Sequence, residues 1–266
     1  MIEPVGLREM QVFWLRLGKR MGMSMDDRTL EALIDYFAQF VTEHKRSRME
    51  EVLAQRTRHI AVVVEDILKP HNASAVVRSC DCFGVQDFHV VENRYEYDVN
   101  PSVSRGASKW VDVIRYRQPE VNNTETCFGW LKERGYTIYA TTPHGDSMQL
   151  PEVGVGGKVA LLFGNELEGA SEYALQYADR RLAIPMYGFT ESFNLSVSAA
   201  ICLYDLTCKL RASGVDWRLS DREVKEIKLR WYKRLVKHAE RLQEQFLKVP
   251  TPSSSRQFGR GESSVL

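Results

Sequence analysis

The chain of 266 residues carries 36 Lys and Arg against 35 Asp and Glu, which gives a formal net charge of +1 and excludes a strongly basic or acidic class of protein. Hydrophobic residues make up 44% and charged residues 27%, the balance of a folded globular protein and not of a disordered or fibrous one. No apolar run is long enough to cross a bilayer, and the start, Met1-Ile2-Glu3-Pro4, lacks a signal-peptide pattern.

Residues 1–58 are predicted to form a helical extension. Asp26 or Asp27 can cap a first helix, whose apolar residues recur at helical spacing: Leu30, Leu33, Ile34, Phe37 and Val41. A second short helix is predicted around Met49, Val52 and Leu53. Its flanks are basic, with Lys45, Arg46, Arg48, Arg56 and Arg58. Taken alone, this basic cluster is best interpreted as a solvated helix face.

From His59 to residue 212 the pattern changes to alternating strands and helices. Short β-branched runs predict strands at Ile60–Val64, Phe88–Val91, Trp110–Ile114, Tyr136–Ala140, Val159–Phe163 and Leu182–Ile184. Helices are predicted between them at Ala73–Phe83, Thr124–Arg134 and Ser171–Ala178, and a longer one at Ser192–Arg211. This order predicts an α/β domain with a mostly parallel sheet and helices on both faces. Ligands of such sheets bind beyond the carboxyl ends of the strands.

Residues 213–248 are predicted to carry a basic C-terminal helix. Ser213-Gly214 is a stop signal, and Ser220 can cap a helix running to about Leu247. Trp231 and Tyr232 are interleaved with its cations, Arg222, Lys225, Lys228, Arg230, Lys233, Arg234 and Lys237. The tail 249–266, with its serines and isolated glycines, is predicted to be disordered.

The cysteines argue against a structural metal. Their number is five, without regular spacing, which indicates free thiols in a reducing cytoplasm. Cys80 and Cys82 form the one close pair, but on a helix residues two apart point to nearly opposite sides. We therefore expect no metal site.

Three polar segments follow strands and could carry chemistry. In the first, Lys69-Pro70-His71-Asn72, Asn72 is placed to cap the next helix. Val76, Cys80 and Phe83 share the face expected to pack on the sheet. Arg78 falls on the other side among small residues. A surface arginine and a site for anionic ligands are both compatible with this pattern.

The second segment is an apolar strand that stops at Gly164 and continues as Asn165-Glu166-Leu167-Glu168-Gly169. Gly164 permits close approach of the backbone to a flat ligand, although a structural turn would have the same sequence. Because no G-x-G-x-x-G follows any strand, a classical NAD site is not expected.

The third segment, Ile184-Pro185-Met186, leads through Gly188 to a helix predicted to begin near Ser192. Ser192, Asn194 and Ser196 crowd its first turn. Capping needs one such side chain, so the surplus indicates binding.

These segments, in this order, resemble motifs 1, 2 and 3 of the SPOUT methyltransferases of the SpoU/TrmH branch, over about His59 to Lys209. The likeness is strongest to its tRNA (guanosine-2′-O)-methyltransferases, through Lys69-Pro70-His71-Asn72, Ser74-Ala75 and Gly106-Ala107-Ser108-Lys109-Trp110-Val111. The resemblance implies a deep trefoil knot, which no sequence pattern reveals, and a homodimer.

The resemblance also assigns roles by position. Arg78 matches the motif 1 arginine that activates the ribose hydroxyl, and Asn72, Glu166, Ser192 and Asn194 match its supporting polar residues. S-adenosylmethionine would bind in three loops, with Thr141, Thr142, Phe163, Gly164, Ile184, Met186, Phe193 and Leu195. Two positions depart from the usual pattern. Phe193 replaces Leu and could reshape the adenine pocket, and Ser79 replaces Thr.

The implied activity is 2′-O-methylation of a ribose in tRNA, a guanosine of the D-loop. Expected RNA contacts are Arg46, Arg48, Arg58, Lys228, Lys233 and Arg234, because cations and aromatic rings can follow a phosphate backbone and stack on bases. The same chemistry on ribosomal RNA and a noncatalytic RNA-binding module stay open as alternatives. Neither DNA nor a membrane is an expected partner.

Overall fold

The computed structural model describes residues 25–97 and 106–248. They fall into two compact units, residues 42–231 and residues 25–41 with 232–248. The expected helical content of residues 1–24 and the expected disorder of the tail 249–266 lie outside the described residues. Within the described ranges, no helix has both the length and the apolar character needed to span a membrane.

The smaller unit contains α2 (Asp27–Ala38), the end of α9 (Asp221–Leu235) and α10 (Ala239–Lys248). Asp26 caps α2 as predicted, because its carboxylate accepts hydrogen bonds from the Thr29 backbone N at 2.9 Å and from the Thr29 hydroxyl at 2.6 Å. The buried face of α2 carries Leu33 and Phe37. Between α2 and α10, the rings of Tyr36 and Phe246 lie 4.9 Å apart.

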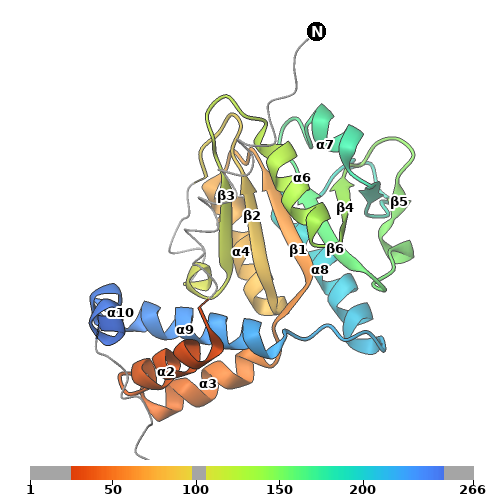
Figure 1. Ribbon diagram of the computed structural model, residues 1–266. Coiled ribbons are helices and arrows are strands. Elements are labelled where there is room, and N and C mark those ends of the chain that lie inside the picture. Colours follow the sequence, from red (N-terminus) through yellow and green to blue (C-terminus); the bar gives the residue numbers. More distant parts are fainter. Residues whose placement is uncertain (1–24, 98–105, 249–266) are drawn as a thin grey trace, which may run out of the picture. The chain divides into compact units, whose positions relative to one another are not determined.

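The larger unit is built on a seven-stranded sheet (Figure 1). Its strands are β1 (Thr57–Glu65), β2 (Val85–Val91), β3 (Asp112–Tyr116), β4 (Tyr136–Thr141), β5 (Met148–Gln149), β6 (Lys158–Phe163) and β7 (Arg180–Ala183). The order across the sheet is β3-β2-β1-β6-β4-β7-β5, and every neighbouring pair is parallel. The predicted parallel sheet is confirmed, and the two-residue β5 is an addition to it.

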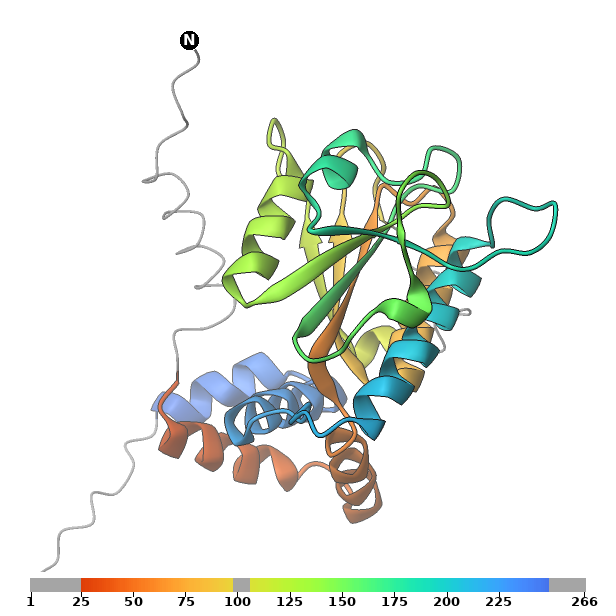
Figure 2. The same ribbon diagram turned by 90° about the vertical axis from the view of Figure 1, so that its right-hand side faces the viewer.

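Helices cover both faces of this sheet. α4 (Pro70–Phe83) and α8 (Leu195–Ala212) pack against each other on one face, and α6 (Asn123–Glu133) covers the other, as Figure 2 shows. The unit also contains α3 (Glu43–Leu53), α7 (Glu172–Tyr177) and the short 3₁₀ helices η1 (Ala107–Lys109) and η2 (Leu150–Glu152). The central strands β1 and β6 are buried on both sides, which explains their nearly unbroken apolar sequences.

Three helix ends differ from the sequence-based expectation. α4 begins at Pro70 with Lys69 as its N-cap, so Asn72 lies inside the first turn and does not cap the helix. Proline is favoured at the first helical position because it has no N–H to leave unpaired. α8 begins at Leu195, and its cap is Asn194 instead of Ser192. The single C-terminal helix expected up to Leu247 is two helices, α9 and α10, separated where His238 adopts a positive φ of 56°.

The carboxyl ends of β1, β4, β6 and β7 meet at one edge because these strands are parallel neighbours. The loops that follow them, together with the first turn of α4 and the start of α8, therefore gather in one place. This is the position that parallel sheets use for ligands.

Candidate active site

A pocket of about 650 Å³ opens at this edge of the sheet. Its walls come from the loops after β4, β6 and β7 and from the first turn of α4. All eight residues expected to bind the cofactor line it: Thr141, Thr142, Phe163, Gly164, Ile184, Met186, Phe193 and Leu195. Of the residues expected to be catalytic, Asn72, Glu166, Ser192 and Asn194 line it and Arg78 does not. The fold thus brings together side chains more than a hundred positions apart in sequence.

Glu166 joins the loop after β6 to the start of α4. Its Oε2 accepts a hydrogen bond from the Leu68 backbone N at 2.9 Å. Its Oε1 accepts from the Lys69 backbone N at 3.1 Å and from Asn72 Nδ2 at 2.9 Å. The carboxylate therefore satisfies N–H groups at the start of a helix, where a negative charge is stabilised.

Asn72 links Glu166 to the third segment. The side chain is 4% exposed, and its Oδ1 accepts a hydrogen bond from Asn194 Nδ2 at 3.2 Å. The Oδ1 of Asn194 in turn accepts from the backbone N and hydroxyl of Ser196, at 2.9 and 2.6 Å. One chain of hydrogen bonds thus connects all three segments, from Glu166 through Asn72 and Asn194 to Ser196.

Arg78 and Ser192 are expected catalytic residues that take no part in this chain of hydrogen bonds. Both side chains are exposed. Ser192 belongs to the pocket wall. Arg78 follows Asn72 on α4 by six residues, a rise of about 9 Å along the helix axis, and so stands outside the pocket wall. A ligand bound in the pocket can contact Arg78 only with a part that extends beyond the pocket wall.

Packing within the protein requires a glycine at position 164. A Cβ at this position would lie 2.1 Å from the backbone N of Ala170 and 2.2 Å from the carbonyl carbon of Gly169. Backbone atoms cannot yield in the way that a flexible side chain can. The turn between residues 164 and 169–170 therefore requires a glycine for packing, and Gly164 also lines the pocket, where its predicted approach to a flat ligand stays a prediction.

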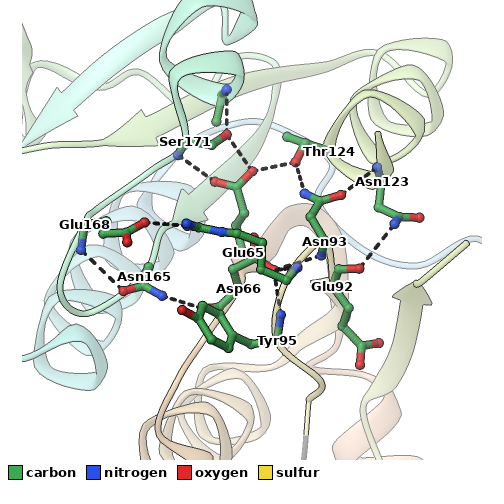
Figure 3. A network of polar contacts seen from close by, with 12 residues as sticks. Glu65, Asp66, Glu92, Asn93, Tyr95, Asn123, Thr124, Asn165, Glu168 and Ser171 are labelled. Atoms are coloured by element: carbon green, nitrogen blue, oxygen red, sulfur yellow. Dashed lines mark hydrogen bonds and ion pairs between the residues drawn. The ribbon is translucent and has the colours of Figure 1, made fainter. Parts of the chain in front are cut away.

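Two buried residues beside Glu166 were not among the expected site residues: Asn165, which lines the pocket, and Asp66, which Asn165 contacts (Figure 3). Asn165 Nδ2 donates to the carbonyl of Asp66 at 2.8 Å. The Asp66 carboxylate accepts from the backbone N of Asn93 and of Arg94, each at 2.8 Å. An asparagine directly after a strand-ending glycine was a visible signal, but the partner of an amide side chain cannot be read from sequence.

Arg58 has a structural role in place of the expected RNA contact. Its guanidinium donates to Asp87 at 3.1 Å, to Asp112 at 3.0 Å and to Glu223 at 3.0 Å. Burial lowers the pKa of Arg58, but these carboxylates outweigh it and raise the pKa above its usual range. A guanidinium surrounded by carboxylates at hydrogen-bond distance is already neutralised and is a poor phosphate ligand.

The other expected RNA contacts lie on two helices. Arg48 on α3 is 69% exposed and pairs with Glu51 at 2.8 Å, and Arg46 pairs with Glu43. Lys228 on α9 pairs with Glu50 at 2.9 Å with 21% of its side chain exposed. In the smaller unit, Lys233 lies 3.7 Å from Glu240, and Arg234 is exposed. The exposed pairs of Arg46 and Arg48 are weak and exchange partners readily.

No metal centre is found among residues 25–97 and 106–248: they contain no group of three or more His, Cys, Asp or Glu side chains that could hold an ion. Cys80 is buried and Cys82 is exposed, and both are free thiols. The pocket lining combines amides, hydroxyls and apolar side chains with the charged side chains of Lys69, Glu166, Glu168, Arg181 and Glu191.

Comparison with known proteins identifies the family. Residues 59–204 match the model of the SpoU rRNA Methylase family, and this range contains all three segments that line the pocket. The chain belongs to the SpoU methylase family. The assignment confirms the family resemblance found in the sequence.

Curated relatives and solved structures agree with this assignment. The tRNA (guanosine(18)-2′-O)-methyltransferase of Borreliella burgdorferi is 38% identical, over 80% of this chain and 95% of that one. The protein of the same name from Thermus thermophilus is 41% identical, over 62% and 82%. The crystal structure of the A. aeolicus TrmH/SpoU tRNA modifying enzyme superposes with a TM-score of 0.66 at 31% identity, covering 73% of this chain and 98% of that one. The SpoU methyltransferase AviRb from Streptomyces viridochromogenes, in complex with the cofactor AdoMet, has the same fold at 23% identity, with a TM-score of 0.51 and coverage of 61% and 62%.

Proposed function

We propose that this protein transfers a methyl group from S-adenosylmethionine to the 2′-oxygen of a ribose in tRNA, a guanosine of the D-loop. The observation that carries the proposal is the pocket, in which the three segments typical of the family meet through Glu166, Asn72 and Asn194. The choice of tRNA is supported by the relatives from Borreliella burgdorferi and Thermus thermophilus, both named tRNA (guanosine(18)-2′-O)-methyltransferase.

The pocket fits S-adenosylmethionine in size and chemistry. Its volume of about 650 Å³ lies within the range of roughly 300–1,000 Å³ that is usual for small-molecule sites. Phe163, Ile184 and Leu195 supply apolar walls for the flat adenine, while Thr141 and Thr142 supply hydroxyls. When bound, the sulfonium of this cofactor supplies an electrophilic methyl carbon.

The residues of this chain then have to orient the ribose and assist loss of its proton. A guanidinium is protonated at any physiological pH, so Arg78 is not the base. We assign to Arg78 the binding of an RNA phosphate and the stabilisation of negative charge on the 2′-oxygen as the O–H bond breaks. The hydroxyl proton leaves to that phosphate or to another group beside it, and the 2′-oxygen takes the methyl group that bound S-adenosylmethionine would supply.

Asn72, Glu166 and Asn194 serve as the frame between Arg78 and the pocket. Their hydrogen bonds fix the first turn of α4 relative to the loops after β6 and β7. Because Arg78 extends from the same helix, this frame sets where its guanidinium stands. Ser192 adds an exposed hydroxyl on the pocket wall, available to substrate.

We further propose that RNA follows the cations of α3, α9 and the residues after it, which include Arg46, Arg48, Lys228, Lys233 and Arg234. The catalytic domain would comprise residues 59–212. Two extensions, residues 1–58 and 213–248, would bind the RNA. The trefoil knot implied by the family, at the carboxyl end of the catalytic domain, is part of the same proposal. Five free cysteines agree with a location in the reducing cytoplasm.

A homodimer is also proposed. α8 carries an outward stripe at helical spacing, in which Val197 is 44% and Tyr204 63% exposed. Apolar residues repeated on the open side of a helix are typical of an interface. Light scattering should give about twice the mass of the chain, and Tyr204→Asp should halve it. A wild-type monomer would contradict the dimer.

The decisive experiment is methyl transfer from labelled S-adenosylmethionine to total tRNA and to ribosomal RNA, with mapping of the modified nucleotide. Label at one 2′-O-methylguanosine of the D-loop is expected. Label found in ribosomal RNA alone would show that the substrate is ribosomal RNA and would leave the proposed reaction, 2′-O-methylation, unchanged. Cofactor and RNA binding by calorimetry without any transfer would favour a noncatalytic RNA-binding module.

A further inference from the structure

Two consecutive side chains of the loop after β6 hold the loop after β1. Asn165 Nδ2 donates to the carbonyl of Asp66, and Glu166 accepts from the backbone N of Leu68 and of Lys69. The same pair of loops is thus joined twice within a few residues. Both residues line the pocket, but so far only Glu166 has been given a role in the site.

Asn165 determines the shape of the turn that carries Glu166. Its side chain is 5% exposed, and its Oδ1 accepts from the backbone N of Leu167 at 2.8 Å and of Glu168 at 3.3 Å. Its own backbone N and O pair with Gly169 at 2.8 and 2.9 Å. Every polar group of Asn165 is therefore engaged in closing the turn or in fastening it to Asp66.

Asp66 extends the clamp to a third loop. It is 4% exposed and has a φ of 50°, a conformation that is costly for a residue with a Cβ. Its carboxylate accepts from the backbone N of Asn93, Arg94 and Tyr95. On the outside, Arg94 Nη2 donates to Glu168 at 2.6 Å and joins this third loop to the loop after β6. Figure 3 shows Asp66 between the Asn93–Tyr95 loop and Asn165.

We propose that Asp66 and Asn165 are positioning residues for methyl transfer. They act through Glu166: by fixing the turn after β6 on the end of β1, they hold the Glu166 carboxylate at Leu68, Lys69 and Asn72. The link to methyl transfer rests on the proposed function, whereas the control of Glu166 rests on the contacts alone. The experiment below separates the two.

The test variant is Asn165→Asp, which keeps the size of the side chain. One oxygen can still accept from Leu167 and Glu168, but the second faces the Asp66 carbonyl without a proton between them. The unpaired oxygens should push the turn away and release Glu166 from Leu68 and Lys69. In the cofactor-free protein, hydrogen exchange at the amides of Leu68 and Lys69 should accelerate about tenfold or more.

The matched control is Thr57→Val, at the start of β1. The Thr57 hydroxyl donates to the Trp217 carbonyl at 2.6 Å and accepts from the His59 backbone N at 2.9 Å, at the other end of the strand from Asp66. This substitution should lower thermal stability about as much, yet leave the exchange of Leu68 and Lys69 unchanged. Equal acceleration in both variants would mean general loosening and would overturn the proposal, as would protection retained in Asn165→Asp.

Calorimetry and kinetics give the functional result. Asn165→Asp should weaken S-adenosylmethionine binding and lower kcat by about tenfold each, with the KM for tRNA within about twofold of the wild type. If Asn165→Asp does not fold, Asp66→Asn keeps an acceptor for the Asn93–Tyr95 loop and should show the same pattern to a smaller degree. A wild-type protein that binds no cofactor would refute the proposed function, while the exchange data would still decide the role of Asn165.

Discussion

At the level of single residues, Arg78 is separated from the pocket that its helix helps to build. Because its side chain is exposed, Arg78→Ala should cost little packing energy. We expect the melting temperature and cofactor affinity to stay near wild type while methyl transfer falls by about a thousandfold or more, as when a charge-stabilising donor is lost. Arg78→Lys, which keeps the charge but not the fork of donors, should recover only a small part. Near-normal turnover of Arg78→Ala in single-turnover assays would remove this residue from the mechanism.

Gly164 gives a second prediction at this scale. Gly164→Ala forces a Cβ to within 2.3 Å of the backbone at residues 169–170 and should destabilise the protein by about 3 kcal/mol or more. Cofactor binding should be lost as well, because the turn that moves carries Glu166. Gly129 on α6 is the matched control, since nothing lies within 4 Å of a Cβ there. Gly129→Ala should stabilise by about 0.5–1 kcal/mol, as measured by urea unfolding.

His89 makes the stability of the protein depend on pH. It is fully buried, with Nδ1 3.0 Å from the Tyr116 hydroxyl, and burial lowers its pKa to about 3 from 6.5. Between these values the unfolded chain binds a proton that the folded chain does not bind. The free energy of unfolding should therefore fall as the pH falls below about 6.5, with up to about 1.4 kcal/mol per pH unit coming from this residue.

The measurement is urea unfolding from pH 7.5 to pH 4.5. His89→Phe keeps an aromatic ring between Tyr116 and Trp130 but cannot titrate. The free energy of unfolding of His89→Phe should fall less steeply with falling pH than that of the wild type. The difference between the two slopes should correspond to about one bound proton. Parallel curves for the two proteins would show that His89 does not control this dependence.

At the level of elements, α9 combines an anchor with a basic surface. Trp231 is 1% exposed, and its Nε1 donates to the Trp110 carbonyl at 3.1 Å. Removing everything after α8 would therefore destroy buried packing and would not isolate RNA binding. Point substitutions at the cations are the cleaner test.

The combined substitution Lys228→Gln, Lys233→Gln and Arg234→Gln should lower tRNA affinity and flatten its salt dependence. Each lost phosphate contact takes roughly one unit from the slope of log affinity against log salt concentration. Lys228 should contribute least, because Glu50 already neutralises it. Lys132→Gln on α6, an exposed cation on the opposite side of the sheet from α4 and α8, is the control. An unchanged slope in the triple variant would place the RNA elsewhere.

A helix or strand can be predicted from sequence when the residues that determine it are close together in the chain. The strands β1 and β6 were predicted because burial on both faces gives an apolar run, and Asp26 because capping is local. β5 was missed because two residues carry no pattern. The break at His238 was missed because neither Gly nor Pro marks it. The frame of Glu166, Asn72 and Asn194 could be located only by family motifs, since its hydrogen bonds join positions far apart in the chain.

At the level of the whole molecule, ligand binding should need no metal. The part of the chain that the structure describes holds no group of three or more His, Cys, Asp or Glu side chains that could hold a metal ion, although single carboxylates such as Glu166 and Glu191 line the pocket. Calorimetry with S-adenosylmethionine in the presence of a chelator should give the same affinity as in its absence. The measurement is made without RNA, because magnesium ions help RNA to fold. A loss of affinity on chelation would contradict this prediction.

The pairing of β1 with β6 has a consequence for how the site comes into existence. Ile60 lies beside Val159, and β4 and β7 join the sheet from still other parts of the chain. Strand pairs of this kind form slowly. Closing a loop of about a hundred residues costs conformational entropy, and the contacts between the strands offset that cost only after the loop has closed. No early intermediate can hold all the pocket walls. Cofactor binding should therefore be the last signal to return during refolding, after secondary structure, and a nascent chain should remain without an active site until the residues up to α8 have left the ribosome.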